Sequence, residues 1–361
     1  MRLRRPTPTS ALDRRGFGRL LALSGLAVAT GGTTAGEVRR TAATRALPLV
    51  KPPRLAAGDR VGLVLPASME IEPSRLELAR EQLAAIGFEP VLGEHVAKRR
   101  GYLAGTDRER AEDVNRMFAD PEVRGVFCYS GGWGSPRVLP HLDYDLIRRH
   151  PKPLVGYSDN TALINAVHAE TGLVTFHGPN AAGHLEPWTL ERFRRALMST
   201  EPIGVLANPP KRDDELVPRF YRAVTIAGGR ARGRLVGGNL TLVAALMGTP
   251  WEVDTRGAIL LLEDIHEEPY RIDRMLTQLA QSGKLAAAAG VAFGFCTDCP
   301  VRGPSLGLEE VLADHLGPLG VPALSGLAFG HVEKKLTLPL GLEATLDADA
   351  GTLTIDEAAV V

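Results

Sequence analysis

From residue 60 to residue 198, short apolar runs alternate with segments whose apolar residues recur at helical spacing. Strands that alternate with helices predict a parallel sheet covered by helices on both faces, so we expect an α/β fold. In such sheets, binding and catalytic sites form where the strands reach their carboxyl edge. The predicted strands are 61–67, 88–92, 125–129, 154–157 and 173–177, and the predicted helices are 74–86, 107–118, 161–169 and 189–198.

A chain of 361 residues has room for two domains of ordinary size. Residues 208–215 are polar and contain two prolines, as an interdomain connection does. Further strands and helices follow it, with apolar runs at 258–262 and 290–295. We predict an N-terminal α/β domain over 54–200, a connection over 201–231 and a C-terminal α/β domain over 232–361.

The charge of the chain is balanced, with 42 Lys and Arg residues against 42 Asp and Glu residues. Neither this balance nor the aromatic fraction of 5% favours a nucleic-acid partner. We find no internal repeat and no apolar segment long enough to span a membrane in the mature protein.

The amino terminus resembles an export signal rather than part of the fold. Arg14 and Arg15 precede a short, mildly apolar run at 20–30, which is typical of a twin-arginine signal. We therefore expect residues 1–45 to be a signal and linker, and the mature protein to be exported to the periplasm or another extracytoplasmic space. A disordered basic tail is the alternative.

Three cysteines are too few for a disulfide framework. Cys296 and Cys299 have C-x-x-C spacing, which fits a redox pair or a disulfide, but no second pair completes a zinc site. The interpretation that we favour is that they are small packing residues at the end of a strand.

Ser158 lies where an apolar strand gives way to a helix. A serine at such a turn stands at the carboxyl edge of the sheet, with the N–H groups of the next helix beside it. Asp159 or Asn160 is expected to cap that helix. An ordinary capped turn would show the same pattern, and the usual G-x-S-x-G sequence is not matched because Asn160 replaces the second glycine.

The glycine-rich loop at 130–134 follows the third predicted strand. It lacks the lysine and the spacing of common phosphate-binding loops. Its glycines would let a backbone N–H point at a reacting oxygen, as an oxyanion hole requires, although a plain turn is the simpler alternative.

A nucleophilic serine needs a base, and the base needs an orienting acceptor. His331 follows a glycine at the end of an apolar run, and Glu263 ends a buried strand, where a carboxylate needs a partner. Either residue could instead have a structural role. His177, in the same domain as Ser158, is the rival base.

Several separated segments resemble the LD-carboxypeptidases of serine peptidase family S66, which include microcin C immunity-type peptidases. The resemblance runs from about residue 53 to residue 346. The matching segments are 131–134 (GGWG), 156–161 (GYSDNT), 176–179 (FHGP), 237–240 (GGNL), 262–264 (LED), 269–276 (PYRIDRML), 330–331 (GH) and 336–339 (LTLP).

The resemblance implies a flavodoxin-like N-terminal domain, a smaller α/β C-terminal domain and an active site at their junction. It implies that Ser158 is the nucleophile, His331 the base and Glu263 its orienter, which favours His331 over His177. The backbone N–H groups of Gly132 and Asp159 would form the oxyanion hole.

The activity that the resemblance implies is release of terminal D-alanine from a peptidoglycan tetrapeptide through an acyl-enzyme. The muropeptide is then the substrate, no cofactor or metal is required, and a homodimer is expected. Two departures bear on the substrate: Ser130 stands where many members have Arg, and Lys335 where many have Asn.

Two other functions remain open at this point. One is a detoxifying peptidase of the microcin C type, although export argues against a cytoplasmic toxin as its target. The other is an exported protein that binds cell-wall peptides in a cleft between two α/β domains without turning them over.

Overall fold

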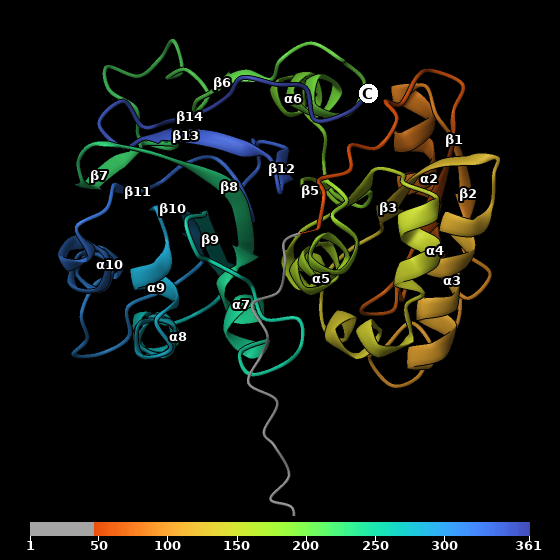
Figure 1. Cartoon of the computed structure of the whole chain (residues 1–361), viewed down its shortest axis with the longest axis horizontal. Coiled ribbons are helices and arrows are strands. Elements are labelled where there is room, and N and C mark those ends of the chain that lie inside the picture. Colours follow the sequence, from red (N-terminus) through yellow and green to blue (C-terminus); the bar gives the residue numbers. More distant parts are fainter. Residues whose placement is uncertain (1–46) are drawn as a thin grey trace, which may run out of the picture. The chain divides into compact units, whose positions relative to one another are not determined.

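The structure is a computed structural model that describes residues 47–361, and contacts within this part of the chain form one compact unit (Figure 1). The predicted export signal at residues 1–45 lies outside the described residues. In the part that is described, every helix is too short or too polar to cross a membrane.

Six strands form the first sheet, in the order β12-β5-β4-β3-β1-β2 (Figure 1). Strands β1 to β5 are parallel, and β12 pairs antiparallel with β5. The order β2-β1-β3-β4-β5 is that of flavodoxin-like sheets, which confirms the expected fold class. The strands are β1 (Arg60–Val64), β2 (Glu89–Leu92), β3 (Val123–Cys128), β4 (Leu154–Gly156), β5 (Thr175–His177) and β12 (Leu338–Leu340).

The helices of this part follow the predicted segments closely. Helix α3 begins with a capping box in which Thr106 and Glu109 bond each other's backbone N–H. The six-residue helix α4 was not predicted. The helices are α2 (Pro73–Ile86), α3 (Asp107–Ala119), α4 (Tyr144–Arg149), α5 (Thr161–Thr171) and α6 (Pro187–Leu197), with 3-10 turns η1 (Ser135–Arg137), η2 (Leu139–His141) and η3 (Ser158–Asn160).

Eight strands form the second, mixed sheet, in the order β6-β14-β13-β8-β9-β10-β11-β7. Strands β6 and β7 lie at its two edges and come from residues 201–231, so the predicted connection also contributes to this sheet. The strands are β6 (Gly204–Leu206), β7 (Val224–Ala227), β8 (Arg230–Asn239), β9 (Ile259–Ile265), β10 (Gly290–Thr297), β11 (Ala323–Ser325), β13 (Glu343–Asp347) and β14 (Thr352–Ile355). The helices are α7 (Leu240–Ala245), α8 (Pro269–Gln281), α9 (Lys284–Ala287) and α10 (Leu308–Leu316), with 3-10 turn η4 (Gly317–Leu319).

Helix α5 joins the two sheets (Figure 1). The side chain of Asn165 accepts a bond from the N–H of Gly237 at 3.1 Å and donates to its C=O at 2.9 Å. Thr161 Oγ1 accepts from the N–H of Asn239 at 3.0 Å. Since α5 directly follows Ser158, these buried bonds set the position of Ser158 relative to β8 and its neighbour β9.

Candidate active site

Ser158 lies at a strained turn at the carboxyl edge of the first sheet. Strand β4 ends at Gly156, and Ser158 opens the 3-10 turn that leads into α5. Its φ angle is +64°, a conformation that residues other than glycine seldom adopt. Such strain is typical of functional turns.

The residues after Ser158 tie the turn to the glycine-rich loop instead of capping the helix. Asp159 Oδ2 accepts a bond from the N–H of Ser135 at 2.7 Å, and Asn160 Nδ2 donates to the C=O of Ser130 at 3.0 Å. Neither side chain bonds the first turn of α5, so the predicted capping role was wrong. The 3-10 turn continues directly into the helix, which leaves these side chains free to bond the neighbouring loop.

The structure brings Ser158, His331 and Glu263 together in one hydrogen-bonded chain. Ser158 Oγ lies 2.9 Å from His331 Nε2. His331 Nδ1 lies 2.7 Å from Glu263 Oε2, which also accepts from the backbone N–H of His331 at 3.2 Å. The three residues come from the turn after β4, the end of β9 and the loop before β12.

The charge on Glu263 decides which nitrogen of His331 carries the proton. Burial raises the pKa of this fully buried carboxyl, but the neighbouring rings of His177 and His331 outweigh burial and lower the pKa to about 2. An ionised carboxylate only accepts hydrogen bonds, so Nδ1 of His331 must be the donor. Nε2 is then free to accept the proton of Ser158.

His177 does not contact Ser158 as a base would. It is buried at the end of β5, and its Nε2 lies 3.8 Å from Glu263 Oε1. The rival base is therefore on the far side of the carboxylate from His331.

Gly131 and Gly132 lie beside the serine. A Cβ added to Gly131 would come within 2.8 Å of Ser158 Oγ and 3.2 Å of the Asp159 nitrogen, so this loop passes directly over the nucleophile. The N–H groups of Gly132 and Asp159 have no hydrogen-bond partner among residues 47–361. Two unpaired N–H donors on the turns flanking the serine are what an oxyanion requires.

Lys335 and Tyr157 border the triad. The Lys335 ammonium lies 4.5 Å from the centre of the Tyr157 ring and 3.3 Å from its hydroxyl, and the same ring packs edge-on against His331. Burial lowers the pKa of Lys335 to about 8, although the charge of Glu263 acts in the opposite direction. Sequence reasoning noted Lys335 only as a departure and did not place it near the site.

Asp264 follows Glu263 and anchors helix α7. Its carboxylate accepts bonds from Asn239 Nδ2 and from the N–H and hydroxyl of Thr241, each 2.9–3.0 Å long. Burial and the charge of Glu263 raise the pKa of Asp264 to about 6. This carboxylate holds the end of β9, and with it Glu263, against the start of α7.

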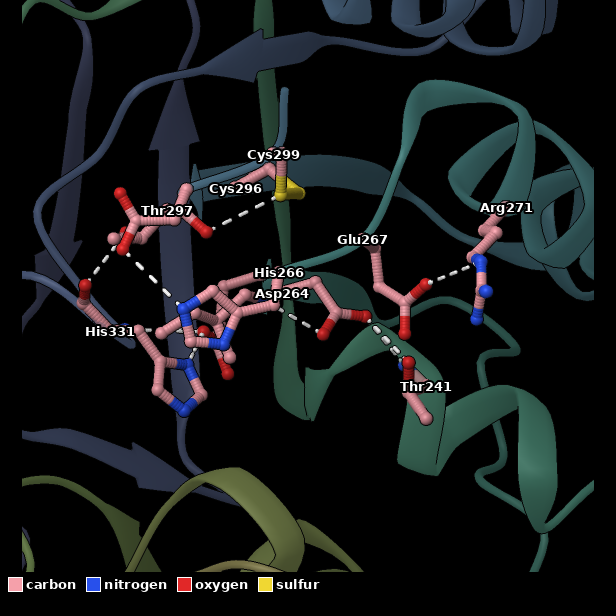
Figure 2. Close-up of a disulfide and its surroundings, with 12 residues drawn as sticks. Thr241, Asp264, His266, Glu267, Arg271, Cys296, Thr297, Cys299 and His331 are labelled. Carbon is pink, nitrogen blue, oxygen red and sulfur yellow. Dashed lines mark hydrogen bonds and ion pairs between the residues drawn. A yellow bond between two sulfur atoms is a disulfide. The ribbon is translucent and has the colours of Figure 1, made fainter. Parts of the chain in front are cut away.

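Cys296 and Cys299 form a disulfide next to the histidine loop (Figure 2). The interpretation of two packing cysteines was therefore wrong. A turn with φ of +51° at Asp298 brings the sulfurs together, and C-x-x-C spacing was the signal for it. Thr297, between them, donates a bond from its hydroxyl to the C=O of His331 at 2.7 Å. The disulfide thus closes the loop that supports His331.

The serine, histidine and backbone N–H groups of the site suit acid–base and nucleophilic chemistry. Among the described residues, no three His, Cys, Asp or Glu side chains are grouped as ligands for a metal ion. The arrangement can ionise a serine hydroxyl at a histidine and hold an oxyanion at two backbone N–H groups.

Comparisons with known proteins identify the family of this chain. Residues 61–178 match the LD-carboxypeptidase N-terminal domain, and residues 232–346 match the LD-carboxypeptidase C-terminal domain. The probable murein peptide carboxypeptidase of Bacillus subtilis is 42% identical over 85% of this chain and 94% of its own length. The murein tetrapeptide carboxypeptidase of Pseudomonas aeruginosa is 35% identical over 80% of this chain and 94% of its own.

A solved structure of the microcin C7 self-immunity protein MccF superposes with a TM-score of 0.78. It is 28% identical to this chain and is matched over 86% of this chain and all of MccF. The domain matches alone span more than half of the sequence. The chain therefore belongs to the LD-carboxypeptidase family of peptidases.

Proposed function

We propose that this protein is a serine carboxypeptidase that hydrolyses the L,D amide bond and releases terminal D-alanine from peptidoglycan tetrapeptides. The observation that carries the proposal is the continuous chain from Ser158 Oγ through His331 to Glu263, with bonds of 2.9 Å and 2.7 Å. The relatives named as murein peptide and murein tetrapeptide carboxypeptidases support the substrate class.

The first half of the reaction forms an acyl-enzyme. His331 Nε2 takes the proton of Ser158 Oγ as that oxygen attacks the amide carbonyl carbon. The N–H groups of Gly132 and Asp159 hold the oxyanion, an effect worth about 10²–10³ in rate per donor. The imidazolium, stabilised by ionised Glu263, then gives its proton to the nitrogen of D-alanine as the C–N bond breaks.

The second half releases the shortened peptide. Water loses a proton to His331 and attacks the ester carbonyl of the acylated Ser158. His331 returns that proton to Ser158 Oγ as the ester bond breaks, which restores the starting state.

A panel of peptides tests the substrate assignment. The wild-type protein should release D-alanine from the muropeptide tetrapeptide and leave the matched tetrapeptide with terminal L-alanine intact. Equal release from both peptides, or none from the first, would contradict the proposed L,D specificity.

A detoxifying peptidase is the second candidate, because the fold of MccF matches nearly the whole described chain. It predicts cleavage of an acyl-sulfamoyl nucleoside amide at a kcat/KM above that for the tetrapeptide. The binding-protein alternative predicts tight tetrapeptide binding and no labelling of Ser158 by a fluorophosphonate.

We further propose export through the twin-arginine route and assembly as a homodimer. Replacement of Arg14 and Arg15 by lysine should leave the protein in the cytoplasmic fraction, whereas an unchanged distribution would refute this route. Light scattering of the mature protein should give twice the monomer mass, and a monomer mass at micromolar concentration would exclude the dimer.

A further inference from the structure

The carboxylate of Glu263 lies between two histidine rings. Its Oε2 accepts hydrogen bonds from the ring Nδ1–H and from the backbone N–H of His331. Its Oε1 faces the Nε2 of His177 at 3.8 Å. Glu263 is fully buried and His177 is 1% exposed, so solvent does not reach either group.

The facing atoms of this second pair are otherwise unpaired. Within residues 47–361, neither Glu263 Oε1 nor either ring nitrogen of His177 has a hydrogen-bond partner. Nearly all buried polar atoms in folded proteins are hydrogen-bonded, and an unpaired one is costly. A hydrogen bond from His177 Nε2 to Glu263 Oε1 would give both atoms a partner.

The surroundings of His177 hold its ring toward Glu263. Its backbone pairs with Gly156 of β4 on one side and Leu338 of β12 on the other. The ring packs edge-on against Tyr157 and Phe329, at 6.0 Å and 5.8 Å between ring centres. On β8, Gly238 leaves space for the ring, because a Cβ at that position would lie 2.8 Å from Cδ2 of His177.

We infer that His177 is a positioning residue, which donates Nε2–H to Glu263 Oε1 and so directs Oε2 at the Nδ1–H of His331. This inference rests on the proposed function, in which Glu263 orients the base. A carboxylate held at one oxygen only can rotate about its terminal bond, whereas one held at both oxygens keeps the geometry that His331 needs.

The separation of 3.8 Å is longer than a hydrogen bond. The inference therefore requires the two atoms to approach each other when substrate binds, as contacts in free active sites commonly do. The low pKa of Glu263, about 2, agrees with two stabilising rings, since burial alone would raise it. Positive charge develops on His331 during the reaction, and a carboxylate in a fixed position stabilises that charge best. We therefore expect His177 and Glu263 to move together when substrate binds.

Three substitutions distinguish the effect of the His177 hydrogen-bond donor from the effect of the size of its ring. His177→Phe keeps the ring and removes the donor. His177→Gln places an amide N–H at the distance of Nε2, and His177→Asn places one a bond shorter, out of reach of Oε1. We expect kcat to fall about 10- to 100-fold in His177→Phe and His177→Asn with KM unchanged, and to recover at least tenfold in His177→Gln over His177→Asn.

His168→Phe provides a matched control. His168 is a largely buried histidine of the same domain that bonds the C=O of Leu173 and not the triad. The His168→Phe variant should retain the kcat of the wild type. Equal losses in the Gln, Asn and Phe variants of His177, each folded by circular dichroism, would overturn the positioning role.

The rate of Ser158 labelling by a fluorophosphonate gives a readout that needs no peptide substrate. It should follow the same order: wild type, then Gln, then Asn and Phe. A wild-type protein that is labelled but releases no D-alanine refutes the proposed substrate and leaves His177 testable. Equal labelling of all four proteins refutes the role of His177 and leaves the proposed function standing.

Nitrogen NMR of the wild-type protein covers the case in which His177→Phe does not fold. His177, assigned by the loss of its signals in His177→Gln, should carry its proton on Nε2. A proton on Nδ1 alone would overturn the inference, because that tautomer cannot donate to Glu263.

Discussion

Ser158 Oγ and His331 Nε2 lie 2.9 Å apart although 173 positions separate them in the sequence. Ser158 follows strand β4 of the first sheet, while Glu263, the partner of His331, is on strand β9 of the second. The distance therefore depends on how α5 docks against β8. The few buried bonds at that contact are as important for the site as the triad itself.

Asn165 is the most informative residue of that contact. Asn165→Ala leaves both the N–H and the C=O of Gly237 buried without a partner. We expect the free energy of unfolding to fall by about 2–4 kcal/mol, since each buried unpaired group costs about 1–3 kcal/mol. Urea unfolding measures this directly. A change below about 0.5 kcal/mol would show that the contact tolerates its loss.

Glu263 should matter for rate rather than for substrate affinity. Glu263→Gln keeps the shape of the side chain but removes the charge that stabilises the His331 imidazolium. We expect kcat to fall about 10³- to 10⁴-fold, as in other triads with a neutralised acid. Steady-state kinetics checks this, and a loss of less than tenfold would mean that His331 works without the carboxylate.

Gly131 is expected to be required for steric reasons. The Cβ of Gly131→Ala would collide with Ser158 at 2.8 Å from Oγ. We expect kcat/KM to fall at least about 100-fold, since a displaced nucleophile loses its attack geometry. Gly317→Ala is the control, because a Cβ there has no neighbour within 4 Å. Equal activity of both variants would contradict the position of this loop.

Lys335 should lower stability at neutral pH. Its pKa of about 8 in the folded protein is below the ordinary 10.5, so the folded state binds fewer protons between these values and its free energy of unfolding rises with pH there. Below pH 8, burying the charge costs about 3 kcal/mol. The contact with Tyr157 offsets part of this cost.

Lys335→Met should therefore raise the free energy of unfolding by about 2 kcal/mol at pH 7, and this gain should disappear by about pH 10.5. Denaturant unfolding at both pH values measures it. The neighbouring Lys334→Met should change stability by less than about 0.5 kcal/mol at either pH. A gain for Lys335→Met that does not depend on pH would argue against a buried ammonium.

The disulfide should contribute modestly to stability because it closes a loop of only four residues. Replacing Cys296 and Cys299 by serine should lower the free energy of unfolding by about 2 kcal/mol, or Tm by about 4 °C. A dithiol reductant should lower the Tm of the wild type equally and leave the serine variant unchanged. An unchanged wild-type Tm under reduction would mean that the bond contributes nothing.

Much of the fold was predictable because its elements are marked locally. Strands β1 to β5 are short apolar runs between amphipathic helices, and the family resemblance implied a flavodoxin-like arrangement for them. Strands β6 and β7 were missed because both are short, partly exposed edge strands in a polar, proline-containing stretch. Local patterns do not identify strands that form only by pairing with distant residues.

The residues of the site were predictable from the sequence, but the contacts between them were not. The residues alone left His331 and His177 as rival bases, and the resemblance chose His331. The structure gives each ring a place, with His331 between Ser158 and Glu263 and His177 beyond the carboxylate. The capping role of Asp159 and Asn160 failed because tertiary bonds to Ser135 and Ser130 replaced local ones.

The central claim is that Ser158 attacks the peptide. The most direct test measures D-alanine release from a muropeptide tetrapeptide by the wild type, by Ser158→Ala and by the control Ser282→Ala. We predict release by the wild type and by Ser282→Ala, and at least about 10³-fold less by Ser158→Ala. Comparable release by Ser158→Ala would contradict a nucleophilic role for this serine.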